Sequence, residues 1–195
     1  LSGKDLTGTI LKGADLTDTV LPNVSLSEKD FQKTVFNGVD LSGKDLSSSS
    51  LWYASFKNTN LKNTNLREAD LMKSDLTKIK NKSLAGSDLT DAALTFANLS
   101  GVDLSGVILA QTQFYKADLS GVDFTVTSKT SYDGSLFLKA NLSNSNFEDV
   151  DLSPEKIFVT TFENKAHVIN LHGQDFIENL FGSGYPNIHV FSPEV

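Results

Sequence analysis

A large apolar side chain, leucine or phenylalanine, returns at every fifth position over most of this chain. A period of five matches neither the 3.6-residue repeat of an α-helix nor the two-residue alternation of a β-strand, so the backbone must turn a corner once per repeat. Short segments joined by corners build a solenoid, in which each coil is stabilised by its neighbours. We call the apolar sites central positions, and the first series of them comprises Leu1, Leu6, Leu11, Leu16, Leu21, Leu26, Phe31, Phe36, Leu41, Leu46, Leu51, Phe56, Leu61, Leu66, Leu71 and Leu76.

Two further positions in each repeat are restricted in residue type. The residue two places before a central position is commonly small, as at Ala14 and Ala69, which indicates that a repeat holds one large and one small inward side chain. The residue directly before the central position is often Asp or Asn, as at Asp15 and Asn60. We expect these side chains to point outward and to form hydrogen bonds at the corners, as Asx residues do in turns.

The five-residue frame is interrupted twice. After Leu76 the next central residue is Leu84, and after Phe124 it is Tyr132, so each interval is eight residues instead of five. The sequence therefore predicts three extra residues at two corners, within the polar segments 77–83 and 125–131, and both segments are expected to protrude as loops. Beyond the second loop the frame is expected to continue in step through Ile157 to Phe162.

The repeats "ADLTD", "TNLKN", "ADLMK", "ANLSG" and "ADLSG" resemble those of the pentapeptide-repeat family. The resemblance covers roughly residues 1–162 and implies an all-β fold, the right-handed quadrilateral parallel β-helix. In that fold four repeats form a square coil, with the central residue and the small residue two places before it inside. We expect about eight coils, followed by a cap or tail at residues 163–195 in which Asp175 begins a short helix and Gly182 ends it.

Composition argues against several functional classes. The chain of 195 residues has no cysteine, so disulfides, thiolate metal sites and a cysteine nucleophile are excluded. No stretch approaches the ~18 apolar residues of a membrane span. No glycine-rich phosphate loop or paired-carboxylate motif is present, and the histidines lack metal-ligand spacing. We therefore expect no enzyme activity, no cofactor and no metal site. The histidines all lie in the tail, at His167, His172 and His189.

One of the four faces differs from the others. The two residues after each central position are expected to point outward, and on three faces they are polar or small. On the remaining face six successive coils carry a large apolar or aromatic group. Six such groups in register are expected to form an apolar patch larger than the few hundred Å² that a soluble monomer normally exposes. We call this set the aromatic stripe; it comprises Trp52, Tyr53, Met72, Phe96, Tyr115, Leu138 and Phe158.

Something is expected to cover the aromatic stripe. The tail of about 30 residues could fold back over it, but a tail of that length cannot both cover six coils and close the end of the solenoid. A protein partner or an adjacent domain is therefore expected to contact at least Trp52, Tyr53 and Met72, and a second copy of the chain is one candidate. Trp, Tyr, Met and Phe are the residue types enriched in interface cores.

Lysines occupy two unusual sets of positions. Lys4, Lys29 and Lys44 stand where the small inward residue belongs, so these coils must be distorted or must let the ammonium group reach solvent. The predicted loops also carry lysines, which either attract an anionic partner or belong to solvated loops. These loop lysines are Lys78, Lys80, Lys82 and Lys129.

Two functions remain open beside the possibility of a plain spacer. The first is a protein-interaction scaffold with no nucleic-acid partner. Because Leu1 is already a central position, this would be one domain of a longer protein, such as a bacterial effector that acts in a host cell. The second is an acidic rod that mimics DNA and binds DNA gyrase in the cytoplasm, as quinolone-resistance members of the resembling family do. The net charge of −7 is concentrated at the C-terminal end, with balances of −1, −1 and −5 over residues 1–76, 77–136 and 137–195, which favours the scaffold.

Overall fold

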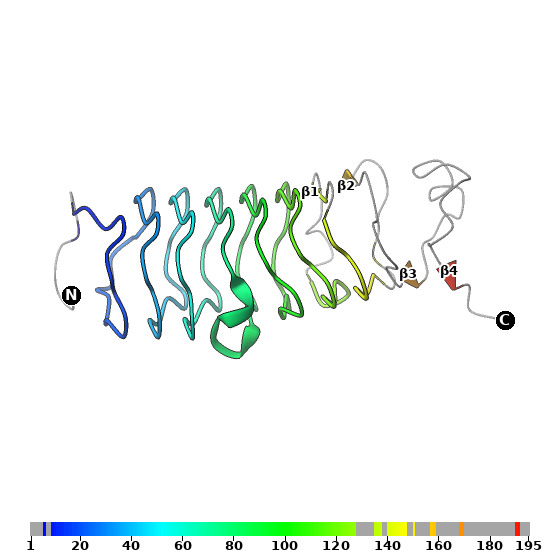
Figure 1. Ribbon diagram of the computed structural model, residues 1–195, viewed down its shortest axis with the longest axis horizontal. Helices are drawn as coiled ribbons and strands as arrows, with labels where there is room; N and C mark the ends of the chain where they lie inside the picture. The colour runs from blue at the N-terminus through cyan, green and yellow to red at the C-terminus, as the bar shows by residue number, and fades with distance from the viewer. Residues whose placement is uncertain are drawn as a thin grey trace.

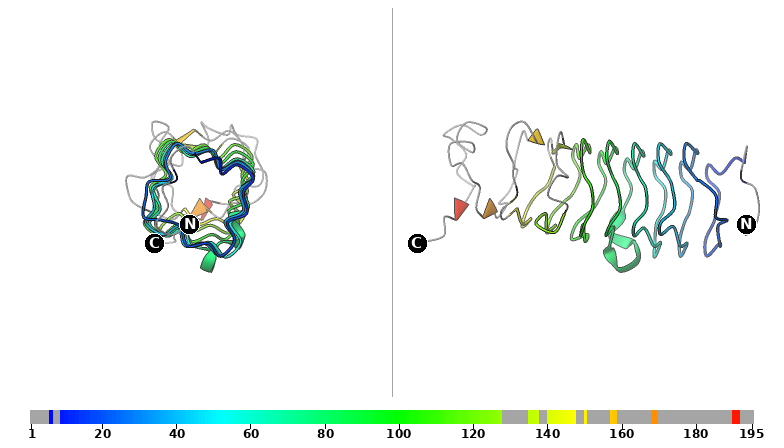
Figure 2. Two further views of the ribbon diagram at one scale, coloured as in Figure 1. Left: turned by 90° about the vertical axis from the view of Figure 1, so that its left-hand side faces the viewer. Right: turned by 180° about the vertical axis from the view of Figure 1, so that it is seen from behind.

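The protein is a rod of stacked coils (Figure 1), and viewed along the rod the coils superpose in a roughly square outline (Figure 2, left). The computed structural model describes residue 6 and residues 9–127, 135–137, 140–147, 150, 157–158, 168–169 and 190–191. Neighbouring coils pair in parallel, for example Asp15 with Val35 and Asp40 with Asn60, twenty residues apart. Four five-residue repeats therefore complete one coil, as the sequence analysis predicts.

Regular secondary structure is sparse because each straight segment pairs through a single residue. Two 3₁₀ turns, η1 (Leu76–Lys78) and η2 (Lys80–Lys82), form the green projection in Figure 1. Strand β1 (Ser135–Leu136) pairs in parallel with β2 (Ile157–Phe158), and β3 (Val168–Ile169) pairs in parallel with β4 (Val190–Phe191).

Each repeat can satisfy all five of its backbone amides. In the repeat 46–50, three amides donate to carbonyls of the neighbouring coils at 2.8, 2.7 and 3.0 Å, and a fourth closes the turn within the repeat at 3.3 Å. The fifth, the amide of Ser47, donates to Oδ1 of Asp45 at 3.1 Å. Buried backbone groups need such partners, so the Asp or Asn before the central residue completes the hydrogen bonding of the corner, as predicted.

The same hydrogen bonds keep these carboxylates charged. Oδ1 of Asp40 accepts the hydroxyl of Ser42 at 2.6 Å and its amide at 3.0 Å, and these bonds hold the pKa of Asp40 below its usual value. The hydroxyl of Ser105 is likewise the largest cause of the lowered pKa of Asp103. At Asp88 burial acts to raise the pKa, but the hydrogen bonds from Thr90 and Arg67 together outweigh it. The carboxylate oxygens of Asp40, Asp88 and Asp103 are thus held in the ionised form by hydrogen bonds from the turn residues that follow them.

The core is a column of central residues with small residues between them. Every described central residue from Leu6 to Phe147 is buried. Phenylalanines of successive coils stack on one another, with centroids 5.7 Å apart for Phe36 and Phe56 and 4.3 Å apart for Phe124 and Phe147. At the small positions, threonine and serine hydroxyls donate either to a carbonyl of the preceding coil, as Thr34 does to Leu11 at 2.6 Å, or to the central residue of their own repeat, as Ser49 does to Leu46 at 2.6 Å. The hydroxyls are therefore buried without being left unsatisfied.

The first interruption of the frame places three extra residues at one corner. Asp75 pairs with Asn98, 23 residues away, whereas after the corner Ser83 pairs with Asp103 at the usual twenty. The expectation that the whole segment 77–83 protrudes is wrong for Ile79, which is only 4% exposed. Ile79 takes the small inward position three residues after Leu76, and the protruding part is η2.

The second interruption also adds three residues, because Asp118 pairs with Asn141, 23 residues away. Thr127, inside the predicted loop 125–131, is nearly buried and donates its hydroxyl to the carbonyl of Phe124 at 2.8 Å. Residues 128–134, including Lys129 and Tyr132, lie outside the described part.

Near the C-terminal end the register departs from the predicted frame. Ser135 pairs with Ile157, 22 residues away, whereas the frame with Ile157 as a central residue aligns it with Phe137. The predicted helix at Asp175–Gly182 lies outside the described residues. In the tail, the described backbone is limited to the parallel pair of β3 and β4.

Candidate interaction surface

The aromatic stripe is built at one corner of the rod, where the two turn residues of successive coils stand in register. The amide of Tyr53 donates to the carbonyl of Met72 at 3.3 Å, and the amide of Phe96 donates to that of Tyr115 at 2.9 Å. Tyr53 and Phe96 have φ values of 58° and 59°. This left-handed conformation is uncommon for aromatic residues, so the turn geometry imposes it at every coil.

The two turn positions are not equally exposed. The second carries Tyr53 and Phe96, each 45% exposed, whereas Trp52, Met72 and Tyr115 at the first are half-buried. The prediction that both positions point outward therefore overestimates the apolar area on display. Leu138 and the side chain of Phe158 lie outside the described residues.

Lysines alternate with the aromatic rings along the exposed edge of the stripe. Nζ of Lys73 lies 3.0 Å from the hydroxyl of Tyr53, 5.2 Å from its ring centroid and 5.8 Å from that of Phe96. Nζ of Lys116 lies 5.3 Å from the rings of both Phe96 and Tyr115. Cation–π contacts at exposed sites contribute about 0.5–1 kcal/mol each. We call the second turn positions of this corner the aromatic–lysine column: Lys33, Tyr53, Lys73, Phe96 and Lys116.

This alternation could have been found in the sequence. The aromatic–lysine column recurs at intervals of 20 residues, or 23 across the first insertion, and its residue types alternate strictly. The aromatic stripe, defined by one apolar group per coil, combines two columns that differ in exposure and charge.

Trp52 has an unusual environment. Its ring centroid lies 5.0 Å from that of Tyr53, and its Nε1 atom is buried with no hydrogen-bond partner. An unsatisfied buried donor costs about 1–3 kcal/mol. The packing of the indole ring beneath the stripe must therefore outweigh this cost.

The inward-position lysines, like many of the inward threonines, donate to a backbone carbonyl of the preceding coil. Nζ of Lys29 donates to the carbonyl of Leu6, and Nζ of Lys44 donates to that of Pro22, each at 3.1 Å. Both side chains are half-buried, which accords with the expected escape of the ammonium group from the interior. Lys4 lies outside the described residues.

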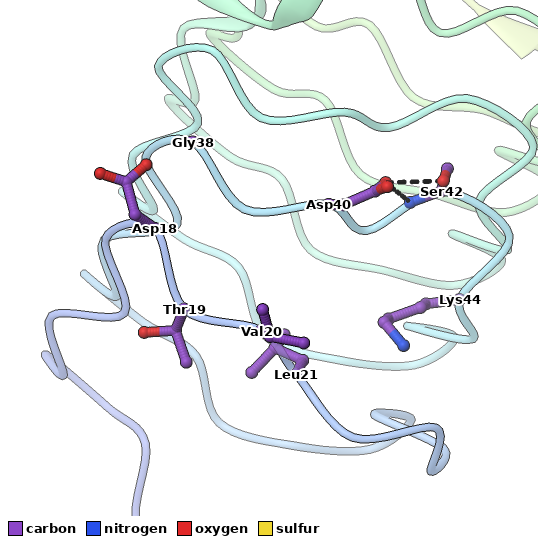
Figure 3. Close-up of a pocket in the computed structure, with 8 residues that line it drawn as sticks. All are labelled: Asp18, Thr19, Val20, Leu21, Gly38, Asp40, Ser42 and Lys44. Carbon is purple, nitrogen blue, oxygen red and sulfur yellow. Dashed lines mark hydrogen bonds between the residues drawn. The ribbon is translucent and has the colours of Figure 1, made fainter. Parts of the chain in front are cut away.

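A pocket of about 340 Å³ lies beside Lys44 (Figure 3). It is lined by Asp18, Thr19, Val20, Leu21, Gly38, Asp40, Ser42 and Lys44. Two of its charged groups are bound within the chain, because Asp40 accepts two hydrogen bonds from Ser42 and Lys44 donates to the carbonyl of Pro22.

The lysines of the first loop are exposed. Nζ of Lys78 pairs with the carboxylate of Asp75 at 2.7 Å, while Lys80 and Lys82 project from η2. In the part of the chain that the structure describes, no group of three or more His, Asp or Glu side chains is placed to hold a metal ion. No helix among the same residues is long and apolar enough to cross a membrane.

A family model matches more than half of the chain. The family model for pentapeptide repeats matches in eight copies, over residues 1–38, 14–51, 40–77 and 87–125. No curated protein matches the chain in sequence.

Several solved structures are similar. A trypsin-treated form of QnrB1, a plasmid-mediated fluoroquinolone resistance protein, is 21% identical over 76% of this chain and 84% of its own, with a TM-score of 0.46. HetL, a pentapeptide repeat protein involved in heterocyst differentiation regulation in the cyanobacterium Nostoc, is 22% identical over 80% of this chain and 76% of its own, with a TM-score of 0.28. On the family match and the fold described above, the chain belongs to the pentapeptide repeat family of right-handed quadrilateral β-helix proteins.

Proposed function

We propose that this protein is a non-catalytic interaction scaffold and that the aromatic stripe is its contact surface for another protein. The observation that carries the proposal is the exposure of two aromatic rings, Tyr53 and Phe96, which stand in register at one corner on alternate coils, with Lys73 between them. The fold requires a turn at these positions but no aromatic side chain, since the same turn elsewhere is made by Asn58, Asn63 and glycines.

The chemistry of the stripe suits a protein partner with acidic groups. Aromatic and methionine side chains are enriched in interface cores, and Trp and Tyr frequently dominate binding energy. Lys73 and Lys116 lie among the rings, so a carboxylate brought to the stripe would meet an ammonium beside each apolar contact.

The non-catalytic part of the proposal rests on the hydrogen bonding of the acidic residues. Asp15, Asp40, Asp45 and Asp103 are each bound to the turn that follows them, and hydrogen bonding to that turn is the largest cause of their lowered pKa values. A general acid or base at neutral pH needs the opposite shift for a carboxyl group. Membership of a longer effector protein stays a prediction, because none of these observations bears on it.

The stripe also weighs against a DNA mimic. A rod that imitates DNA needs negative charge along its length, whereas the aromatic–lysine column displays Lys33, Lys73 and Lys116 along one corner.

Site-specific photo-cross-linking tests the proposed contact surface. A photoreactive phenylalanine analogue in place of Phe96 is expected to yield a cross-linked protein product in the source cells. The matched control is the same analogue in place of Asn63, which occupies the same turn position with φ 55° at the opposite corner. No product from position 96, or equal yields from both positions, would sink the proposal.

A further inference from the structure

A second column of charge runs along the corner next to the aromatic stripe. Each of its residues precedes a member of the aromatic–lysine column by five positions, so the two columns stand on the same coils. Both occupy the second turn position, with φ values between 53° and 59°. The acidic column, as we call it, comprises Glu28, Ser48, Glu68, Asp91 and Gln111.

The charges of the two columns match in spacing. Glu28 and Glu68 are two coils apart, as are Lys33 and Lys73, so each pair spans about 10 Å along the rod. Amides of the acidic column donate to the next coil at 2.7–2.9 Å, which keeps the column in line.

These charges are not paired with one another inside the chain. Among the described residues, the ion pairs are Lys12 with Asp30, Arg67 with Asp88 and Lys78 with Asp75. Glu28, Glu68, Lys33 and Lys73 are all exposed. The carboxylate of Glu68 accepts a hydrogen bond from Ser48 at 2.9 Å, and its neighbour Arg67 is already bound to Asp88.

We propose that the partner of the aromatic stripe is a second copy of this chain, lying parallel to the first and related to it by a two-fold axis along the rod. This inference rests on the proposed function and names its partner. The axis places the acidic column of each copy opposite the aromatic–lysine column of the other. Lys33 of each copy then lies opposite Glu28 of the other, and Lys73 lies opposite Glu68. Each of these ion pairs occurs twice, because a two-fold axis repeats every contact.

The charge pattern selects the parallel arrangement. An antiparallel two-fold dimer through the same face would set each column against its own kind. Lys73 would then oppose Lys73, and Lys33 would oppose Lys116. Like charges held together across an interface cost free energy and suppress that mode of association.

The face between the two columns allows the corners to meet. Its outward positions carry short or polar side chains. Asp30 and Asp70 lie near the proposed axis, where each faces its own copy, and this like-charge cost of the parallel arrangement is reduced at Asp30, whose carboxylate is paired with Lys12 at 3.5 Å. Five coils give a contact about 24 Å long. That is a small interface, in the class of weak and transient complexes. We therefore expect dissociation in the micromolar range and weakening by salt, since exposed ion pairs are screened. The outward positions of this face are Asp30, Ser50, Asp70, Ala93 and Gln113.

Sedimentation velocity with charge-reversal variants tests the inference. The wild-type chain at up to about 500 μM in about 50 mM salt is expected to show a monomer–dimer equilibrium. Lys73→Glu and Glu68→Lys are each expected to weaken it at least about tenfold, since each places like charges in both symmetric contacts. An equimolar mixture of the two variants is expected to restore association as a heterodimer. The matched control, Lys57→Glu, reverses an exposed charge at another corner and should leave the equilibrium unchanged.

Two results would overturn the inference: a wild-type chain that stays monomeric throughout this range, or a mixture of the variants that associates no better than either alone. Circular dichroism of each variant establishes that loss of association is not loss of fold. If position 96 cross-links to a different protein while the wild-type chain is monomeric, the proposed function stands and the second copy is excluded as its partner.

Discussion

Replacement of Phe36 by alanine is expected to lower the free energy of unfolding by about 3–5 kcal/mol. Phe36 is fully buried, stacks on Phe56 with centroids 5.7 Å apart and meets Phe31 edge to face at 5.1 Å. Alanine would remove all of these contacts and leave a cavity in the middle of a coil, where the hydrogen-bonded backbone of the neighbouring coils limits collapse. Urea denaturation followed by circular dichroism measures the loss.

The matched control for this substitution is Phe36→Leu. Leucine fills the equivalent position in most repeats, so its cost is expected to stay below about 1.5 kcal/mol. A loss of less than about 1 kcal/mol for Phe36→Ala would show that the neighbouring coils rearrange to fill the cavity left by the ring. The stacked-core account would then be wrong.

Replacement of Ala92 by lysine is expected to cost about 3–5 kcal/mol, the penalty of an uncompensated buried charge. Ala92 occupies the small inward position in the middle of the rod and is fully buried. Lysine is tolerated at that position in Lys29 and Lys44, where the side chains are half-buried and each ammonium reaches a backbone carbonyl. At position 92 the side chain is fully buried between complete coils, so the ammonium group of a lysine there could not reach solvent. Thermal and urea unfolding of the variant measure the cost.

Ala92→Ser controls for polarity without charge. A hydroxyl at this position can donate to the preceding coil, as that of Thr112 does to Leu89 at 2.8 Å, so the serine variant is expected to lie within about 1 kcal/mol of wild type. If lysine costs no more than serine, the interior admits an ammonium group along the whole rod. Partial exposure would then not be the reason that lysine is tolerated at Lys29 and Lys44.

The sequence predicts the fold well because each repeat position has one physical role. Leu46 could be assigned to the core and Asp45 to the corner from their spacing alone, since packing and backbone hydrogen bonding repeat with the same period of five. The interruption after Leu76 was also visible, because it shifts every later central residue by three.

The burial of individual turn residues and the contacts between coils depend on local geometry, which cannot be predicted from the five-residue period. Ile79 belongs to the core because the turn after Leu76 is completed before the extra residues begin. Trp52 is half-buried and Tyr53 is exposed because the two turn positions of a corner differ in backbone conformation, the second having a positive φ of 58°. The contacts of Lys73 with Tyr53 and Phe96 arise only once successive coils are stacked.

The central claim is that the aromatic stripe is displayed for contact and is not needed to hold the rod together. The most direct measurement is the free energy of unfolding of a variant with Tyr53→Ser and Phe96→Ser. We predict a loss of about 1.5–3 kcal/mol, because Lys73 and Lys116 make three exposed cation–π contacts with these rings and each contributes about 0.5–1 kcal/mol. A loss of about 4 kcal/mol or more, equal to that of a core substitution, would show that the stripe is part of the structural core and would contradict the account.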